Sequence, residues 1–95
     1  MKVIFKYTLN VTDKQVIQMP VGAEILKVDT QYNKICIWAM FDRVKEYDTE
    51  ERVFEIFGTG NSFEESDKRN YLDTIQLYDG EQIYHVFEIN LNKSY

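Results

Sequence analysis

The sequence TIQLYDGEQIYHVFEI, from Thr74 to Ile89, decides the fold of this chain. It contains two runs rich in β-branched and aromatic residues that meet at the pair Asp79-Gly80. Asp-Gly readily adopts the positive φ angles of a type I′ turn, and such a pair between two alternating runs is typical of a hairpin. This stretch therefore predicts two antiparallel strands joined by a tight turn.

Similar runs recur toward the N-terminus, and no helical stripe of comparable strength accompanies them. In residues 2–9 apolar side chains alternate with polar ones, which predicts a half-buried strand. Residues 10–14 favour a turn and residues 15–19 are again extended, so the simplest interpretation is a first hairpin between residues 2–9 and 15–19. Pro20 then marks a strand end or edge, because it lacks an amide hydrogen.

The middle of the chain predicts further strands separated by polar segments. A third strand is expected over residues 23–28, followed by a turn over residues 29–34. Residues 35–41, ICIWAMF, are apolar on both faces, so we expect the central and most buried strand there. Residues 42–51 are strongly charged and predict a solvated loop, after which residues 52–57 alternate again as a strand.

The pattern as a whole predicts an all-β fold, a single domain over residues 1–95. We expect a small antiparallel β-sandwich or barrel-like domain of about seven strands. One short helix near residues 64–71 is allowed, since Ser62 precedes Glu65 by three residues as in a capping box. Residues 90–95 are expected to form a tail.

Composition restricts the classes of function. The chain has 95 residues, 44% of them hydrophobic, so one small core is expected and self-association as a homo-oligomer would add stability. Its net charge of −5 disfavours binding to duplex DNA or RNA, because these polyanions attract proteins chiefly through basic side chains. The single cysteine, Cys36, cannot close an intramolecular disulfide, and no apolar run has the length of a signal peptide or a spanning helix. We therefore expect a cytoplasmic protein that does not bind membranes.

No catalytic motif is recognisable. The single histidine, His85, lies between large apolar residues, and imidazole can act as a general base near neutral pH. The sequence places no serine, cysteine or acid beside it, so a structural histidine bonded across strands is the favoured interpretation. One cysteine and one histidine also fall short of a zinc site, and the acidic segments lack the spacing of calcium ligands. We expect neither a metal nor a cofactor.

The segment Gly58-Thr59-Gly60-Asn61 is the most distinctive loop. Its small residues would let a phosphate or carboxylate approach the backbone amides, although a plain turn with a β-bulge is favoured because the lysine of a P-loop is missing. Aromatic residues could stack on a base, and an arginine could neutralise an anion. The candidate ligand-binding residues are Arg52, Trp38, Gly58, Thr59, Gly60, Asn61, Tyr71 and His85.

Several landmarks occur together in a known family. They are residues 6–9 (KYTL), 12–26 (TDKQVIQMPVGAEIL), 38–39 (WA), 58–60 (GTG), 71–76 (YLDTIQ) and 85–88 (HVFE). In these pieces, which span most of its length, the chain resembles a family of small uncharacterised proteins of phage genomes and prophages. Asp73 stands where that family leads us to expect glycine. The family implies no catalytic residues.

The resemblance and the missing catalytic groups together favour a non-catalytic binding protein. Such a phage-encoded inhibitor of host defence would act in the host cytoplasm, where it either sequesters a nucleotide-derived signal or blocks a host defence protein. One alternative is a small hydrolase or nucleotide-modifying enzyme that uses His85 with an acid such as Glu88 or Asp73. Another alternative is an accessory protein of the virion.

Overall fold

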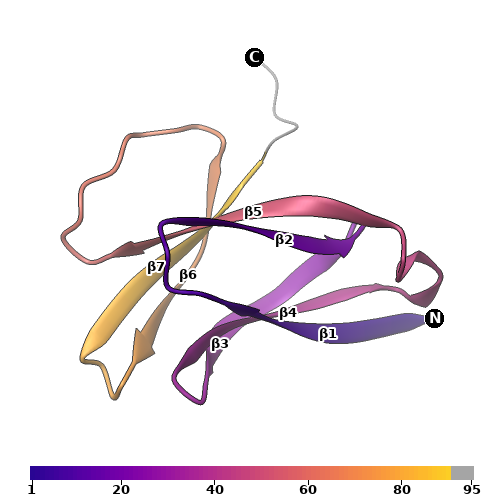
Figure 1. Ribbon diagram of the computed structural model, residues 1–95, viewed down its shortest axis with the longest axis horizontal. Coiled ribbons are helices and arrows are strands. Elements are labelled where there is room, and N and C mark those ends of the chain that lie inside the picture. Colours follow the sequence, from indigo (N-terminus) through magenta and orange to yellow (C-terminus); the bar gives the residue numbers. More distant parts are fainter. Residues whose placement is uncertain (91–95) are drawn as a thin grey trace.

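The computed structural model describes residues 1–90 and consists of strands joined by short connections (Figure 1). The seven strands are β1 (Lys2–Leu9), β2 (Lys14–Pro20), β3 (Glu24–Gln31), β4 (Lys34–Asp42), β5 (Thr49–Gly58), β6 (Arg69–Leu77) and β7 (Gln82–Ile89). A single turn of 3₁₀-helix, η1 (Arg43–Lys45), follows β4. The all-β prediction is confirmed.

The strands form two antiparallel sheets. One has three strands in the order β1-β4-β3, and the other has four in the order β2-β5-β7-β6. Both sheets contribute to one hydrophobic core, which includes Ile37 of β4, Phe54 of β5 and Val86 of β7, each with no exposed surface. The architecture is therefore a β-sandwich, and not a closed barrel.

Period-two alternation explains which side chains reach this core. In β1 the side chains of Val3, Phe5, Tyr7 and Leu9 face inward, as expected. The run over residues 35–41 lies within β4, the central strand of the three-stranded sheet, and its residues Ile35, Ile37 and Ala39 are fully buried. The prediction of a central, buried strand is confirmed.

Both tight hairpins use backbone with positive φ angles. β3 and β4 are joined by Tyr32 and Asn33 alone, at φ +53° and +57°, so the turn predicted over residues 29–34 is shorter than expected. β6 and β7 form the hairpin predicted around Asp79-Gly80, with Leu77 paired to Gln82. The left-handed backbone begins one residue earlier than expected, at Tyr78.

The prediction of a first hairpin is wrong. β1 pairs with β4 and β2 pairs with β5, so the two segments belong to different sheets. The side chain of Gln15 bonds both the N–H and the C=O of Asn10, at 3.0 and 2.7 Å, and so occupies the backbone groups that a paired strand would use. The chain therefore crosses from one sheet to the other between β1 and β2.

The short helix near residues 64–71 is also absent. Residues 61–66 have no regular structure, residues 67–68 form a turn, and β6 begins at Arg69. Phe63 stacks on Phe57 of β5 and holds this segment against the sheet, which local helix propensity does not anticipate. The loop predicted over residues 42–51 is shorter, because β5 begins at Thr49. Of the expected tail only Asn90 is described, and residues 91–95 lie outside the described part.

Candidate functional site

The two-glycine loop leaves β5 as a plain turn. Asn61 donates its N–H to the C=O of Gly58 at 3.1 Å, and Gly60 has a φ of +89° that favours glycine. A Cβ added at Gly58 would lie 3.0 Å from the side-chain nitrogen of Asn61, so that side chain would have to shift slightly. The loop borders a shallow hollow of about 350 Å³ that Tyr84 and Glu81 also line.

His85 is fixed by two threonine hydroxyls. Its Nε2 lies 2.8 Å from Oγ1 of Thr59, and its Nδ1 lies 2.9 Å from Oγ1 of Thr74. Thr74 also contacts the hydroxyl of Tyr71 at 2.5 Å, so the chain of contacts extends from the loop through β7 to β6. A neutral imidazole has one nitrogen that donates and one that accepts, so one threonine hydroxyl can accept from the ring while the other donates to it. The imidazole is thus satisfied at both nitrogens without any carboxylate.

Beside this network the outer face of the four-stranded sheet carries a cluster of aromatic rings, which we name the aromatic face: Phe57, Phe63, Tyr71 and Phe87. The rings of Phe57 and Phe63 are stacked with centroids 4.1 Å apart, and Tyr71 meets Phe87 edge-on at 5.5 Å. Tyr71 and Phe63 remain 58% and 49% exposed, respectively. The face therefore offers rigid aromatic surface to solvent.

One arginine lies against the aromatic face. The guanidinium carbon of Arg69 lies 5.1 to 5.9 Å from the centroids of Phe57, Phe63 and Phe87, a cation–π arrangement. Its Nε donates to Oε1 of Glu55 at 2.7 Å, and its Nη1 donates to a backbone carbonyl of the loop before β6. The charge of Arg69 is therefore already compensated within the protein.

The acids suggested as partners of His85 lie elsewhere. Glu88 is three residues along the same strand, so its side chain projects from the opposite face of the sheet. There both of its oxygens accept from Arg52. Oδ1 of Asp73 accepts from the backbone N–H of Thr74 at 2.8 Å. Neither carboxylate contacts the imidazole.

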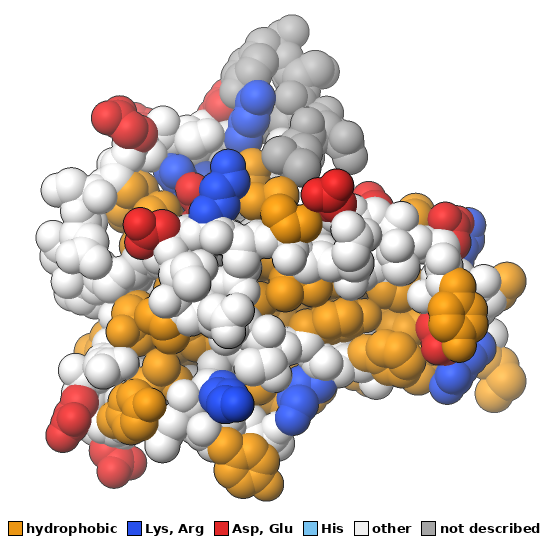
Figure 2. Space-filling model, in the orientation of Figure 1, with side chains coloured by type: hydrophobic (Ala, Val, Ile, Leu, Met, Phe, Trp, Pro, Cys, Tyr) orange, Lys and Arg blue, Asp and Glu red, His pale blue; other side chains and the backbone are white. Residues whose placement is uncertain are grey.

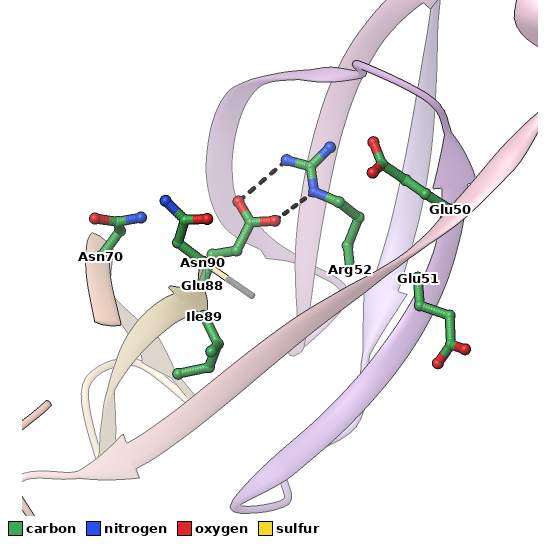
Figure 3. A pocket seen from close by; sticks show the side chains of 7 residues that line it. All are labelled: Glu50, Glu51, Arg52, Asn70, Glu88, Ile89 and Asn90. Atoms are coloured by element: carbon green, nitrogen blue, oxygen red, sulfur yellow. Dashed lines mark hydrogen bonds and ion pairs between the residues drawn. The ribbon is translucent and has the colours of Figure 1, made fainter. Parts of the chain in front are cut away.

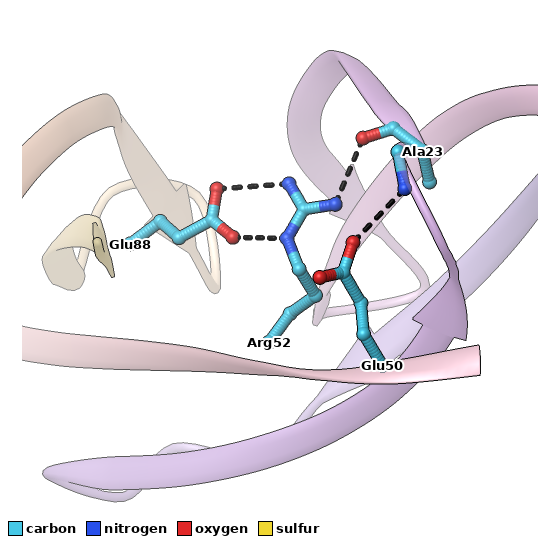
Figure 4. A network of polar contacts seen from close by, with 5 residues as sticks. Ala23, Glu50, Arg52 and Glu88 are labelled. Carbon is cyan, nitrogen blue, oxygen red and sulfur yellow. Dashed lines mark hydrogen bonds and ion pairs between the residues drawn. The ribbon is translucent and has the colours of Figure 1, made fainter. Parts of the chain in front are cut away.

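Arg52 belongs to a separate polar network on the inner side of β5. Figure 4 shows its guanidinium facing Glu88 on one side, while Nη1 donates to the C=O of Ala23 at 2.8 Å. The hydrogen bond to Glu88 is the main cause that raises the pKa of Arg52, with burial opposing it. Glu50 accepts from the backbone N–H of Gly22 at 2.9 Å. Arg52 thus connects β5 to β7 and to the turn before β3.

A hollow of about 300 Å³ lies beside that network, and its lining is acidic. Figure 3 shows Glu50 next to Arg52, the Asn70 and Asn90 amides beyond Glu88, and Glu51 pointing away from Arg52. Among the described residues that line this hollow, Arg52 is the cation, and it is bonded to a carboxylate and a carbonyl, so an incoming anion would have to displace both. The geometry does not favour Arg52 as an anion-binding residue.

Trp38 lies far from the other candidates in the fold. It is on the outer face of the three-stranded sheet, where the register places it between Lys6 of β1 and Lys27 of β3. The structure therefore brings Gly58, Thr59, Gly60, Asn61, Tyr71 and His85 to one region and leaves Trp38 and Arg52 outside it.

Thr74, Arg69 and the phenylalanines of the aromatic face are not among the site residues that the sequence predicts. Thr74 could have been found from the turn, since a hairpin centred on Asp79-Gly80 places Thr74 directly opposite His85, the register that the structure has. No comparable pattern marks Phe63, which reaches the face from an irregular loop.

In residues 1–90, no group of three or more His, Cys, Asp and Glu side chains could hold a metal ion. The same part of the chain contains no helix of the length and apolarity needed to span a membrane.

A family model matches nearly the whole chain. The model, described as "Domain of unknown function (DUF7352)", matches residues 1–94. Neither the curated proteins nor the solved structures include a match to this chain. Because the family model covers nearly the whole sequence, the chain belongs to the DUF7352 family.

Proposed function

We propose that this protein is a non-catalytic binding protein of phage origin that inhibits a host defence protein in the host cytoplasm by covering part of its surface. The observation that carries the proposal is the aromatic face beside His85. It combines exposed rings of Tyr71 and Phe63 with an imidazole held by hydroxyls alone. Tyrosine and other aromatic residues are enriched where proteins bind one another.

Among the described residues 1–90, no carboxylate is bonded to the imidazole of His85. A general base that acts through imidazole is commonly oriented by a carboxylate, as in the serine protease triad. Here both ring nitrogens contact threonine, and Glu88 is bonded to Arg52 on the other face. These contacts support recognition in preference to a reaction.

Charge favours a protein partner over a nucleotide. The hollow beside the two-glycine loop is lined by Glu81, and the hollow beside Arg52 by three glutamates. Phosphates would meet carboxylates in both places, whereas a basic protein surface would be attracted by a chain with a net charge of −5. We therefore expect a partner with a basic rim around an apolar patch.

The test compares variants of the aromatic face with a distant control. Tyr71→Ala and Phe63→Ala should each weaken binding of a partner captured from host lysate and then purified. Tyr47→Ala should leave it unchanged, because Tyr47 is 92% exposed and lies in the loop between β4 and β5. Loss of a central aromatic anchor is expected to weaken binding at least about thirtyfold.

Other outcomes would replace this proposal. Heat on titration with a panel of cyclic nucleotides would favour the version that sequesters a nucleotide-derived signal. Turnover of an ester or phosphoester that His85→Ala abolishes, with the fold intact, would establish an enzyme. Recovery of the chain from purified virions would instead favour an accessory role.

A further inference from the structure

The two sides of the sandwich differ in how they are closed. The edge strands β3 and β6 lie against each other on one side. On the other side β1 and β2 are the edges, and in residues 1–90 no strand pairing joins them. Figure 1 looks onto this second side, with β2 and β1 both in front. One side of the sandwich is therefore open.

Apolar side chains are visible along the open side. Figure 2, in the same orientation, shows a band of hydrophobic side chains between the two front strands. Val3, Phe5 and Tyr7 of β1 and Ile17 of β2 are only partly buried where they pack against the core. A band of this kind gains stability when another surface covers it.

The backbone of β1 presents unpaired groups at this edge. Arg43 donates its N–H to the C=O of Met1 at 2.8 Å, which continues the ladder between β1 and β4. Bonded and non-bonded pairs alternate in an antiparallel ladder, so the odd-numbered residues of β1 point their backbone groups toward β4. Lys2, Ile4, Lys6 and Thr8 therefore direct theirs outward.

β1 is also the edge strand with the least protection against pairing. β2 ends at Pro20, which has no N–H, and both β3 and β6 contain register shifts. β1 pairs with β4 over eight residues without interruption. Its central exposed residue is Ile4, at 52%, and the Lys6 amine bonds Gln31 across the sheet at 2.6 Å, away from the edge. Bulges and prolines normally prevent edge pairing, and β1 has neither; of its two lysines, Lys6 is bonded within its own sheet.

We propose that β1 pairs antiparallel with β1 of a second copy, so that two chains form a homodimer with a continuous six-stranded sheet. The two-fold axis passes beside Phe5, which places Ile4 opposite Lys6 of the second copy and Lys2 opposite Thr8. A shift of the axis to Ile4 would place Lys2 opposite Lys6, and a shift to Lys6 would place two Lys6 side chains together. Like charges directly opposite each other are destabilising, so the register at Phe5, which pairs the whole strand, is favoured over these two neighbouring registers.

The strand fits a second copy because this pairing is self-complementary. In an isologous contact each residue of one chain meets the symmetry-related residue of the other, and the pattern of β1 satisfies this without opposing like charges. The inner face of β1 then brings Phe5 beside Phe5 and Val3 beside Tyr7, which covers part of the apolar band. The outer face of the four-stranded sheet stays free.

The first test is the molar mass in solution. Light scattering after size exclusion should give about twice the 11.4 kDa of one chain at high protein concentration. Ile4→Pro removes an N–H that points outward and leaves the bonds to β4 in place, so the dimer should dissociate at least about tenfold more readily while the β-sheet circular dichroism is retained. Val16→Pro is the matched control, because Val16 occupies the equivalent outward position on β2.

The second test fixes the register. In a Cys36→Ala background, a mixture of Ile4→Cys and Lys6→Cys chains should form a mixed disulfide under mild oxidation, and neither variant should cross-link efficiently with itself. A monomeric wild-type chain at every concentration would overturn the proposal. So would a dimer that Val16→Pro disrupts and Ile4→Pro does not, or efficient self-cross-linking of the Ile4→Cys chain.

Discussion

The side-chain oxygen of Asn33 accepts a hydrogen bond from the backbone N–H of Tyr78 at 3.0 Å, and this contact joins the tips of two hairpins that belong to different sheets. Asn33 has a φ of +57°, so Asn33→Gly keeps the turn while it removes the acceptor. We expect the free energy of unfolding in urea to fall by about 1 kcal/mol. Asn33→Asp retains an acceptor and should stay near wild type; equal losses in the two variants would contradict this role.

The backbone conformation of Tyr32 is expected to lower the stability of the fold. It is 87% exposed and has a φ of +53°, a conformation that is unfavourable for a bulky residue. Tyr32→Asn should raise the free energy of unfolding by about 1 kcal/mol, because asparagine tolerates left-handed backbone and little packing is lost. Tyr47→Asn is the control, since Tyr47 is similarly exposed, at 92%, and has no positive φ. Destabilisation by Tyr32→Asn would contradict this expectation and show that contacts of the Tyr32 ring stabilise the fold.

These turns also show how far local sequence determines the structure. Asp79-Gly80 sets the register of β6 against β7, so the pairing of Thr74 with His85 follows from the sequence. The partners of β1 and β2 do not, because β1 pairs with β4 at separations of more than 25 residues and nothing local distinguishes this from a hairpin. The local sequence encodes which side chains of a strand face the core, whereas the sheet that the strand joins depends on the whole core.

The misplaced site residues have the same explanation. Arg52 was expected to be available to an anion, but its partner Glu88 lies 36 residues later and becomes adjacent only when β5 pairs with β7. Phe63 completes the aromatic face from an irregular loop, where no periodicity predicts its direction. Contacts between distant segments thus determine which candidates share a site.

The Arg52–Glu88 pair should be strongly coupled. Their side chains are only 17% and 16% exposed, so Arg52→Met leaves a poorly solvated carboxylate and should cost about 3 kcal/mol in urea unfolding. The double variant Arg52→Met/Glu88→Leu should lose less than the sum of the single variants. Arg43→Met serves as control, because its pair with Glu46 involves a side chain that is 62% exposed and should change stability by less than about 1 kcal/mol. Additive losses would indicate no coupling.

Asp42 should make stability depend on pH in the acid range. Its carboxylate accepts from the N–H of Val44, and this bond, with the nearby N-terminus, lowers the pKa of Asp42 in the folded state. The ionised form therefore stabilises the fold above the unfolded pKa, and the contribution disappears as pH falls through the lowered value. Asp42→Asn keeps a capping oxygen, so its deficit relative to wild type should shrink in acid. A deficit that is constant from neutral to strongly acidic pH would contradict this linkage.

The stacking of Phe63 on Phe57 is expected to order the loop that carries Thr59. With Phe63→Ala the loop loses the ring that lies 4.1 Å from Phe57 and beneath the guanidinium of Arg69. Hydrogen exchange across residues 59–68 should accelerate, while exchange in β4 stays slow because that strand is buried in the hydrophobic core between the two sheets, away from the aromatic face. The loss in global stability should be only about 1 kcal/mol, since the ring is half-exposed. Phe63→Tyr preserves the stack and should exchange like wild type, so equal acceleration in both variants would mean that other contacts order the loop.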